Sequence, residues 1–158
     1  MPTTWPNNRS KDTADLSAER LYTPELLALT LELAQWPAME NLPVHGEARA
    51  ATCGSTLALD LDLDDAGRIA TLGLRVRACA VGQAAATLFA RHAKGCDLAT
   101  LQSVHDRIEG WLDGEGPLPD WPGLAMLEPA RQFPARHGAI LLPWKSAIAA
   151  LSSAPAAS

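Results

Sequence analysis

At 158 residues the chain is long enough for one domain with its own core, because a domain near this length buries about 70% of its unfolded surface. Its net charge is −5 and its 13 Lys and Arg are scattered, which argues against the phosphate neutralisation that nucleic-acid binding requires. No apolar run approaches the roughly 18 residues of a membrane span, and residues 1–19 lack the apolar stretch of a secretory signal, so we expect a cytoplasmic protein without a membrane partner.

The two ends of the chain differ from its middle. Residues 1–20 and 152–158 are mostly polar or small, and we expect both to be disordered tails around one domain at residues 21–151. Thr23-Pro24-Glu25 predicts a helix start, since a hydroxyl can cap free N–H groups, proline needs no N–H there, and an acid favours the positive end of the helix dipole. This helix is expected to end near Gln35.

The next segment has the pattern of a β-hairpin. The hydrophobic period changes to two, weakly over residues 47–51 and plainly over residues 56–63, where four leucines alternate with residues that include Thr56, Asp60 and Asp62. Residues 64–67 form a polar turn with a glycine available for a left-handed conformation, and residues 69–76 return as the second strand. The pattern therefore predicts an antiparallel hairpin with a third short strand.

The rest of the chain is mainly helical. After Cys79 a helix is expected to run to Lys94-Gly95, and Asp97 can cap the following helix. Residues 114–123 contain three prolines and three glycines and predict a loop, followed by a short turn at 124–127 and a final helix over 135–151, kinked at Pro143. The predicted fold class is α+β, with a small three-stranded antiparallel sheet packed by about five helices.

Two of the three cysteines are predicted to lie together. Unequal spacing argues against a disulfide framework, so each cysteine is a core thiol, a metal ligand or a reactive thiol. Cys53 precedes the hairpin and Cys79 follows it, so strand pairing brings both to the same end of the sheet, where neighbouring strands lie about 5 Å apart. Such a pair is half of a metal site, and the alternative is that both are buried small hydrophobes.

The environments of the cysteines differ. Cys79 lies at a predicted helix N-terminus with Arg75 and Arg77 on its side of the strand, and both features favour the thiolate, which binds metal and accepts sulfur. Cys96 is separated from Cys79 by a helix of about 14 residues, which spans about 20 Å. Cys96 therefore cannot share a metal with Cys79, and we interpret it as a structural or incidental thiol.

Among the histidines only His137 is a candidate ligand. It falls at the start of the last helix, where an imidazole could approach the cysteine pair, although a lone histidine at a helix end is more often solvated. His92 and His105 are expected on helix surfaces and His45 in a loop. Without a phosphate loop, a nucleophile elbow, a two-histidine zinc motif or an acid–base pair, no enzyme activity is expected.

The order of these motifs resembles that of a known family. Cys53-Gly54-Ser55, the alternating strand, the turn at residues 64–69, and Cys79 leading into a helix of small residues resemble the IscU/SufU/NifU N-terminal family of iron–sulfur cluster assembly scaffolds. Residues 133–136 (Phe-Pro-Ala-Arg) followed by Trp144-Lys145 look most like the SufU branch, and the resemblance covers roughly residues 22–151. It implies an IscU/SufU-like fold, a transient iron–sulfur cluster or zinc bound by Cys53 and Cys79, and a cysteine desulfurase and cluster-receiving proteins as partners.

The sequence departs from the family pattern at two ligand positions. The family holds its metal with three cysteines and a nearby aspartate, whereas this chain has Ser55 at the aspartate position and Ala139 at that of the third cysteine. Two thiolates fall short of the four donors that tetrahedral zinc or a two-iron cluster needs. A cluster bridged by two cysteines from each copy of a homodimer, a weak site completed by His137, and a metal-free homologue remain as alternatives.

Two functions are therefore compatible with the sequence. The first is a scaffold-like protein in iron–sulfur cluster assembly that accepts sulfur and holds iron, a cluster or zinc through Cys53 and Cys79. The second is a degenerate homologue that acts as a metal-free docking or regulatory partner of a cysteine desulfurase, as Ser55 and Ala139 suggest.

Overall fold

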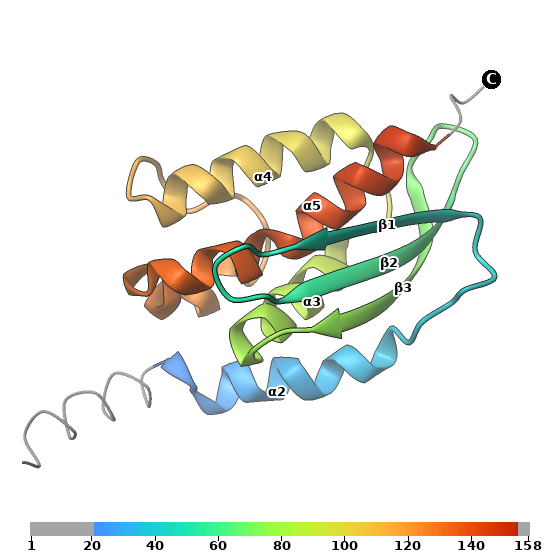
Figure 1. The fold of residues 1–158 in the computed structure, drawn as a ribbon. Coiled ribbons are helices and arrows are strands. Elements are labelled where there is room, and N and C mark those ends of the chain that lie inside the picture. Colours follow the sequence, from blue (N-terminus) through green and yellow to red (C-terminus); the bar gives the residue numbers. More distant parts are fainter. Residues whose placement is uncertain (1–20, 155–158) are drawn as a thin grey trace, which may run out of the picture.

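A three-stranded antiparallel sheet with helices on one face forms the molecule (Figure 1). The computed structural model describes residues 21–154; the tail predicted at residues 1–20, and residues 155–158 of the tail predicted at 152–158, lie outside this range. The elements in chain order are α2 (Pro24–Glu32), the 3-10 helix η1 (Leu33–Gln35), β1 (Val44–Arg49), β2 (Thr56–Leu63), β3 (Ile69–Arg77), α3 (Ala80–His92), α4 (Leu98–Leu112), the 3-10 helices η2 (Leu124–Gln132) and η3 (Pro134–Arg136), and α5 (His137–Ser153). The α+β class is confirmed.

Local sequence signals set several of these boundaries. The Thr23 hydroxyl accepts a hydrogen bond from the Leu26 N–H at 3.1 Å at the start of α2, and the Asp97 carboxylate accepts one from the Thr100 N–H at 2.9 Å at the start of α4. Gly67 has a φ of +77° in the turn between β2 and β3. The helix starts and the hairpin turn therefore lie where the sequence predicts them.

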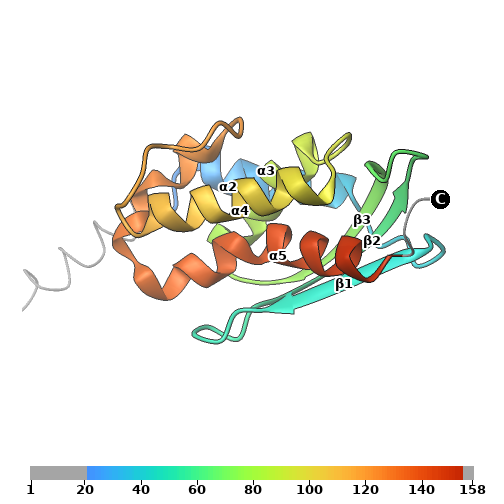
Figure 2. The same ribbon diagram turned by 90° about the horizontal axis from the view of Figure 1, so that it is seen from above.

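The sheet has the order β1-β2-β3, and both strand pairs are antiparallel. The strand leucines at alternate positions of β2 (Leu57, Leu59 and Leu61) are buried on the inner face. Helices α3 and α5 lie against this face, while α2 packs on α3 and α4 packs on α5 (Figure 2). Alternating hydrophobicity thus decides which face of the sheet is covered.

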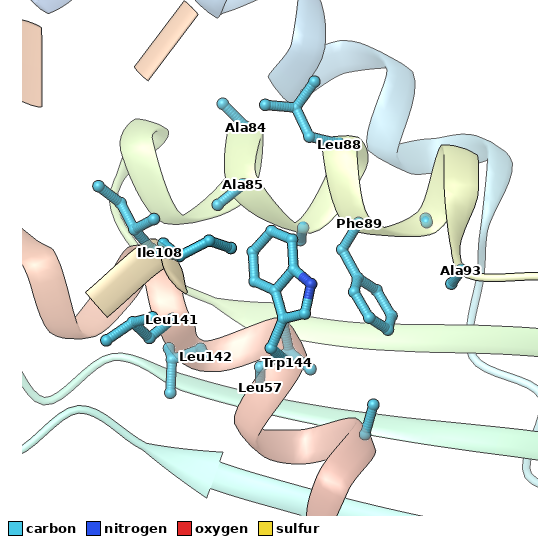
Figure 3. Packing of buried hydrophobic residues seen from close by; sticks show 14 of the residues in the cluster. Leu57, Ala84, Ala85, Leu88, Phe89, Ala93, Ile108, Leu141, Leu142 and Trp144 are labelled. Atoms are coloured by element: carbon cyan, nitrogen blue, oxygen red, sulfur yellow. The ribbon is translucent and has the colours of Figure 1, made fainter. Parts of the chain in front are cut away.

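Helix α5 lies close to β1 because Gly46 has no side chain. A Cβ atom at this position would collide with the carbonyl oxygen of Ser146 and would lie 2.6 Å from the backbone nitrogen of Ala150. Further into the core, the Trp144 ring makes an edge contact with Phe89 at a centroid distance of 5.5 Å (Figure 3). It makes a second edge contact with Trp121 at 5.4 Å. These contacts fix α5 between the sheet and α3.

Three details differ from the sequence prediction. Strand β1 begins at Val44, so His45 lies in a strand rather than in a loop, and its Nδ1 is 2.6 Å from the buried carboxylate of Asp60. The turn predicted at residues 124–127 continues as η2 to Gln132, and α5 extends to Ser153.

None of the helices in residues 21–154 has the length and apolar character to cross a membrane.

Candidate cysteine site

The loop that carries Cys53 contacts the start of α5. The Thr52 hydroxyl donates a hydrogen bond to the carbonyl oxygen of Ala135 at 3.2 Å. A Cβ atom on Gly138 would lie 3.2 Å from the Cβ of Ala50, so the first turn of α5 passes directly beside the loop. Residues far apart in the chain are thereby brought to one end of the sheet.

The start of α3 contacts the same turn of α5. A Cβ atom on Gly82 would lie 3.2 Å from the Cβ of Ala139, and Ala139 is fully buried. Thr56, the first residue of β2, pairs with Arg77, the last residue of β3. Cys53, which precedes β2, and Cys79, which follows β3, therefore lie at the same end of the sheet. The three chain segments that would supply the cysteines in the resembling family therefore meet here.

Cys53 sits in a short loop whose backbone is held by its own hydrogen bonds. The Ala50 N–H donates to the Ser55 carbonyl at 2.8 Å, and the Gly54 N–H donates to the Ala50 carbonyl at 2.9 Å. Gly54 has a φ of +71°, a left-handed conformation that glycine adopts without a steric cost. The loop therefore turns tightly and leaves the Cys53 side chain exposed.

The Cys53 thiol has a polar neighbour that stabilises its charged form. Its Sγ lies 3.1 Å from the Oγ of Ser55, a residue that is only 7% exposed. The hydrogen bond from the Ser55 side chain lowers the pKa of Cys53, the Ser55 backbone and the positive charge of Arg136 act in the same direction, and partial burial opposes them. A lowered pKa raises the fraction of thiolate, the nucleophilic form of cysteine.

Arg136 is held near the site by an aromatic ring. Its guanidinium carbon lies 5.7 Å from the centre of the Tyr22 ring, a distance at which a cation–π contact forms. Arg136 belongs to η3, immediately before α5. The positive charge beside Cys53 thus comes from a part of the chain far from the hairpin.

Cys79 is the N-cap residue of α3, as the sequence predicts, and its side chain is half-buried. Arg75, which was expected to favour the Cys79 thiolate, contacts other groups. The Arg75 guanidinium bonds to Glu40 at 2.9 Å and approaches Asp60 at 3.5 Å on the outer face of the sheet. Arg75 is therefore engaged by carboxylates rather than by the thiol of Cys79.

The remaining candidate ligand, His137, points one ring nitrogen at the backbone. Its Nε2 donates a hydrogen bond to the carbonyl oxygen of Arg131 at 2.9 Å. Within residues 21–154 no group of three or more His, Cys, Asp or Glu side chains is arranged to hold a metal ion. With Ala139 at the third cysteine position, the chain's own residues do not fit a four-donor metal site.

Cys96 lies outside this site. Its Sγ donates weakly to the carbonyl oxygen of His92 at 3.5 Å. Burial raises the pKa of Cys96, and the neighbouring charge of Asp97 acts in the same direction. A raised pKa lowers the fraction of thiolate at Cys96, and the structural or incidental role of this thiol stays a prediction.

Sequence reasoning missed the two partners of Cys53. Ser55 was expected only as a replacement for a ligand, whereas it is the main stabiliser of the Cys53 thiolate. A serine two residues from a cysteine in a glycine turn is a local signal that could have indicated this bond. No local signal connects Arg136 or Thr52 to its partner, because the tertiary packing of α5 brings them together.

Comparison with solved structures identifies the fold. The structure of a nitrogen-fixing NifU-like protein (N-terminal) from Brucella abortus has a TM-score of 0.77 at 24% identity, over 86% of this chain and 95% of that chain. A putative iron–sulfur cluster assembly scaffold protein for the SUF system from Fervidobacterium islandicum has a TM-score of 0.72 at 20% identity, over 83% and 96%. The predicted IscU/SufU-like fold is thereby confirmed. No family model and no curated protein matches the sequence.

Proposed function

We propose that this chain acts in iron–sulfur cluster assembly as a scaffold-like protein that accepts sulfur on Cys53. The proposal depends chiefly on one observation: an exposed thiol with a lowered pKa stands where three segments of this fold meet. A protein with the same fold is described as a putative scaffold for the SUF system, which supports the assignment by analogy. Thiolate character and exposure are the two properties that an acceptor cysteine needs.

The sulfur transfer is a thiol–disulfide exchange. The Cys53 thiolate attacks the outer sulfur of a persulfide on a cysteine desulfurase, and a sulfur–sulfur bond forms at Cys53 as the bond in the donor persulfide breaks. The donor cysteine leaves as a thiolate, so no external oxidant or reductant is required. Ser55 and Arg136 favour this step because they stabilise the Cys53 thiolate before the attack.

Iron, a cluster or zinc would be cargo that needs further donors. Cys53 and Cys79 supply two thiolates, and His137 is engaged with a backbone carbonyl. Because four donors complete a tetrahedral zinc site or a two-iron cluster, lasting metal binding depends on a second copy of the chain or on the receiving protein. Sulfur acceptance needs Cys53 alone.

The experiment is persulfide formation with a cysteine desulfurase. The protein is incubated with the desulfurase and cysteine, and its intact mass is measured without reductant. We expect the wild type and Cys96→Ser, the matched control, to gain the mass of a sulfur atom, and Cys53→Ser to gain none. Equal sulfur acceptance by Cys53→Ser would overturn the proposal.

A second function is favoured by the buried Ala139. Its methyl group faces Gly82 where the family would present a third cysteine, an arrangement that also suits a metal-free docking or regulatory partner of a desulfurase. This alternative requires that the desulfurase still binds a Cys53→Ser, Cys79→Ser variant in a pull-down. If the desulfurase bound the wild type but left no persulfide on Cys53, the docking role would be selected over sulfur acceptance.

A further inference from the structure

The outer face of the sheet carries a cluster of arginines next to the cysteine site. Arg49, at the end of β1, and Arg77, at the end of β3, both pair with Thr56 at the start of β2. All helices in residues 21–154 lie on the opposite face (Figure 2). These side chains therefore surround an open stretch of sheet.

A groove runs along β2 between the two outer strands. It has a volume of about 600 Å³. Thr56 and the small Ala58 form its floor, while Arg49 and Glu47 line the side of β1 and Arg77 and Arg75 line the side of β3. Arg49 and Arg77 lie two strand spacings apart, or about 10 Å at the backbone, so an extended chain fits between them.

Two of the three guanidinium groups are available for a ligand. Arg75 is paired with Glu40 and approaches Asp60. Neither Arg49 nor Arg77 forms an ion pair with any residue in the range 21–154, and both are exposed. The chain as a whole has a net charge of −5. The two arginines without an ion-pair partner therefore form a local positive patch that the overall composition does not predict.

We propose that this groove binds an extended acidic segment of a partner protein. Carboxylates of the segment would pair with Arg49 and Arg77 on the two sides of Thr56, since guanidinium groups bind carboxylates through two parallel hydrogen bonds. Ala58 leaves room for the backbone of the segment further along β2. The groove thus matches its occupant in both shape and charge.

Nucleic acid fits this face less well. Glu47 lines the groove itself, and the exposed carboxylates of Glu40 and Asp62 belong to the same side of the sheet. A phosphate backbone would meet these negative charges along with the arginines, whereas a peptide can place acids opposite arginines and neutral residues opposite the acids.

The groove ends at the loop that carries Cys53. Arg49 and Thr56 directly flank residues 50–55, so a segment bound here would hold its parent protein beside the exposed thiol. The inference goes beyond sulfur acceptance, because binding in the groove requires neither thiol chemistry nor metal.

The test uses a fluorescein-labelled peptide with glutamate and threonine at alternate positions, matched to the eight residues of β2. Fluorescence anisotropy is measured with the full chain, and a peptide with lysine in place of glutamate serves as the ligand control. The variant is Arg49→Glu, Arg77→Glu. The matched control, Arg68→Glu, Arg107→Glu, changes the net charge equally at exposed positions outside the groove.

We expect the wild type to bind the glutamate peptide and added salt to weaken the binding. The groove variant should bind at least about tenfold more weakly and the control variant within about twofold of wild type, with folding of both checked by circular dichroism. Cys53→Ser should bind like the wild type, which separates this surface from the sulfur-transfer proposal. Absence of wild-type binding, an equal loss in both charge variants, or equally tight, groove-dependent binding of a single-stranded DNA probe would overturn the proposal.

Discussion

Ser55 controls how readily Cys53 loses its proton. Its side chain is the largest contributor to the lowered pKa of that thiol. Replacing Ser55 with alanine should therefore move the Cys53 titration to higher pH and reduce the thiolate fraction at neutral pH. The measurement is the rate of iodoacetamide alkylation of Cys53 against pH, in a Cys79→Ser, Cys96→Ser background.

The control is Ser55→Thr, which keeps a hydroxyl at the same position. It should preserve most of the alkylation rate at neutral pH, because its oxygen can still donate to the thiolate. If Ser55→Ala and the parent gave the same pH profile, the serine would have no influence on the thiol and the assigned role of Ser55 would be wrong.

At the scale of single residues, two substitutions should create a metal site. Ala139→Cys adds a thiolate on the turn of α5 that contacts the start of α3, and Ser55→Asp adds a carboxylate beside Cys53. With Cys53 and Cys79 these give four donors in place of two. We expect the double variant to retain one zinc ion per chain after dialysis, measured by metal analysis and chelator competition.

The matched control keeps Ser55→Asp and moves the new cysteine to Ala147, another fully buried alanine of α5. It adds the same thiol away from the candidate site and should retain no more zinc than the wild type. Equal zinc in both variants would show that position 139 has no special relation to Cys53 and Cys79.

At the scale of the element, the approach of α5 to β1 depends on Gly46. Alanine at position 46 would drive its Cβ into the backbone of α5 at Ser146 and Ala150. Because backbone atoms cannot rotate away, we expect Gly46→Ala to lower the free energy of unfolding by about 1–3 kcal/mol, the usual cost of overpacking. Urea denaturation measures this loss.

Gly110 provides the contrasting control. It lies inside α4, and a Cβ there would meet no atom within 4 Å. Gly110→Ala should raise the free energy of unfolding by about 0.4–1 kcal/mol, because alanine reduces the conformational freedom of the unfolded chain. If Gly46→Ala and Gly110→Ala both lowered the free energy of unfolding, the close approach of α5 to β1 would not be the cause of the loss at position 46.

These elements also show which features a sequence makes visible. The start of α2 at Thr23, the start of α4 at Asp97 and the turn of residues 64–67 were predictable, because each depends on side chains a few residues apart. The start of β1 at Val44 was missed because its apolar alternation is weak. The register of the hairpin brought Cys53 and Cys79 to one end, but the contacts of Ser55 and Arg136 with Cys53 needed the folded geometry.

At the scale of the whole molecule, the supply of donors links metal binding to oligomeric state. One chain offers Cys53 and Cys79, and two copies related by a two-fold axis would offer two thiolates each, enough for a two-iron cluster. We expect anaerobic reconstitution with iron, sulfide and a desulfurase to give absorption at about 400 nm only in material of dimer mass. Size-exclusion chromatography with metal analysis measures both properties together.

The Cys53→Ser, Cys79→Ser variant controls for iron bound elsewhere and should remain a monomer without this absorption. A cluster on wild-type protein of monomer mass would contradict the shared site, because a single chain would then have supplied more donors than Cys53 and Cys79. Persulfide on Cys53 with no metal under any condition would separate the two roles, since a chain that accepts sulfur without holding iron must pass it to a partner that supplies the remaining ligands.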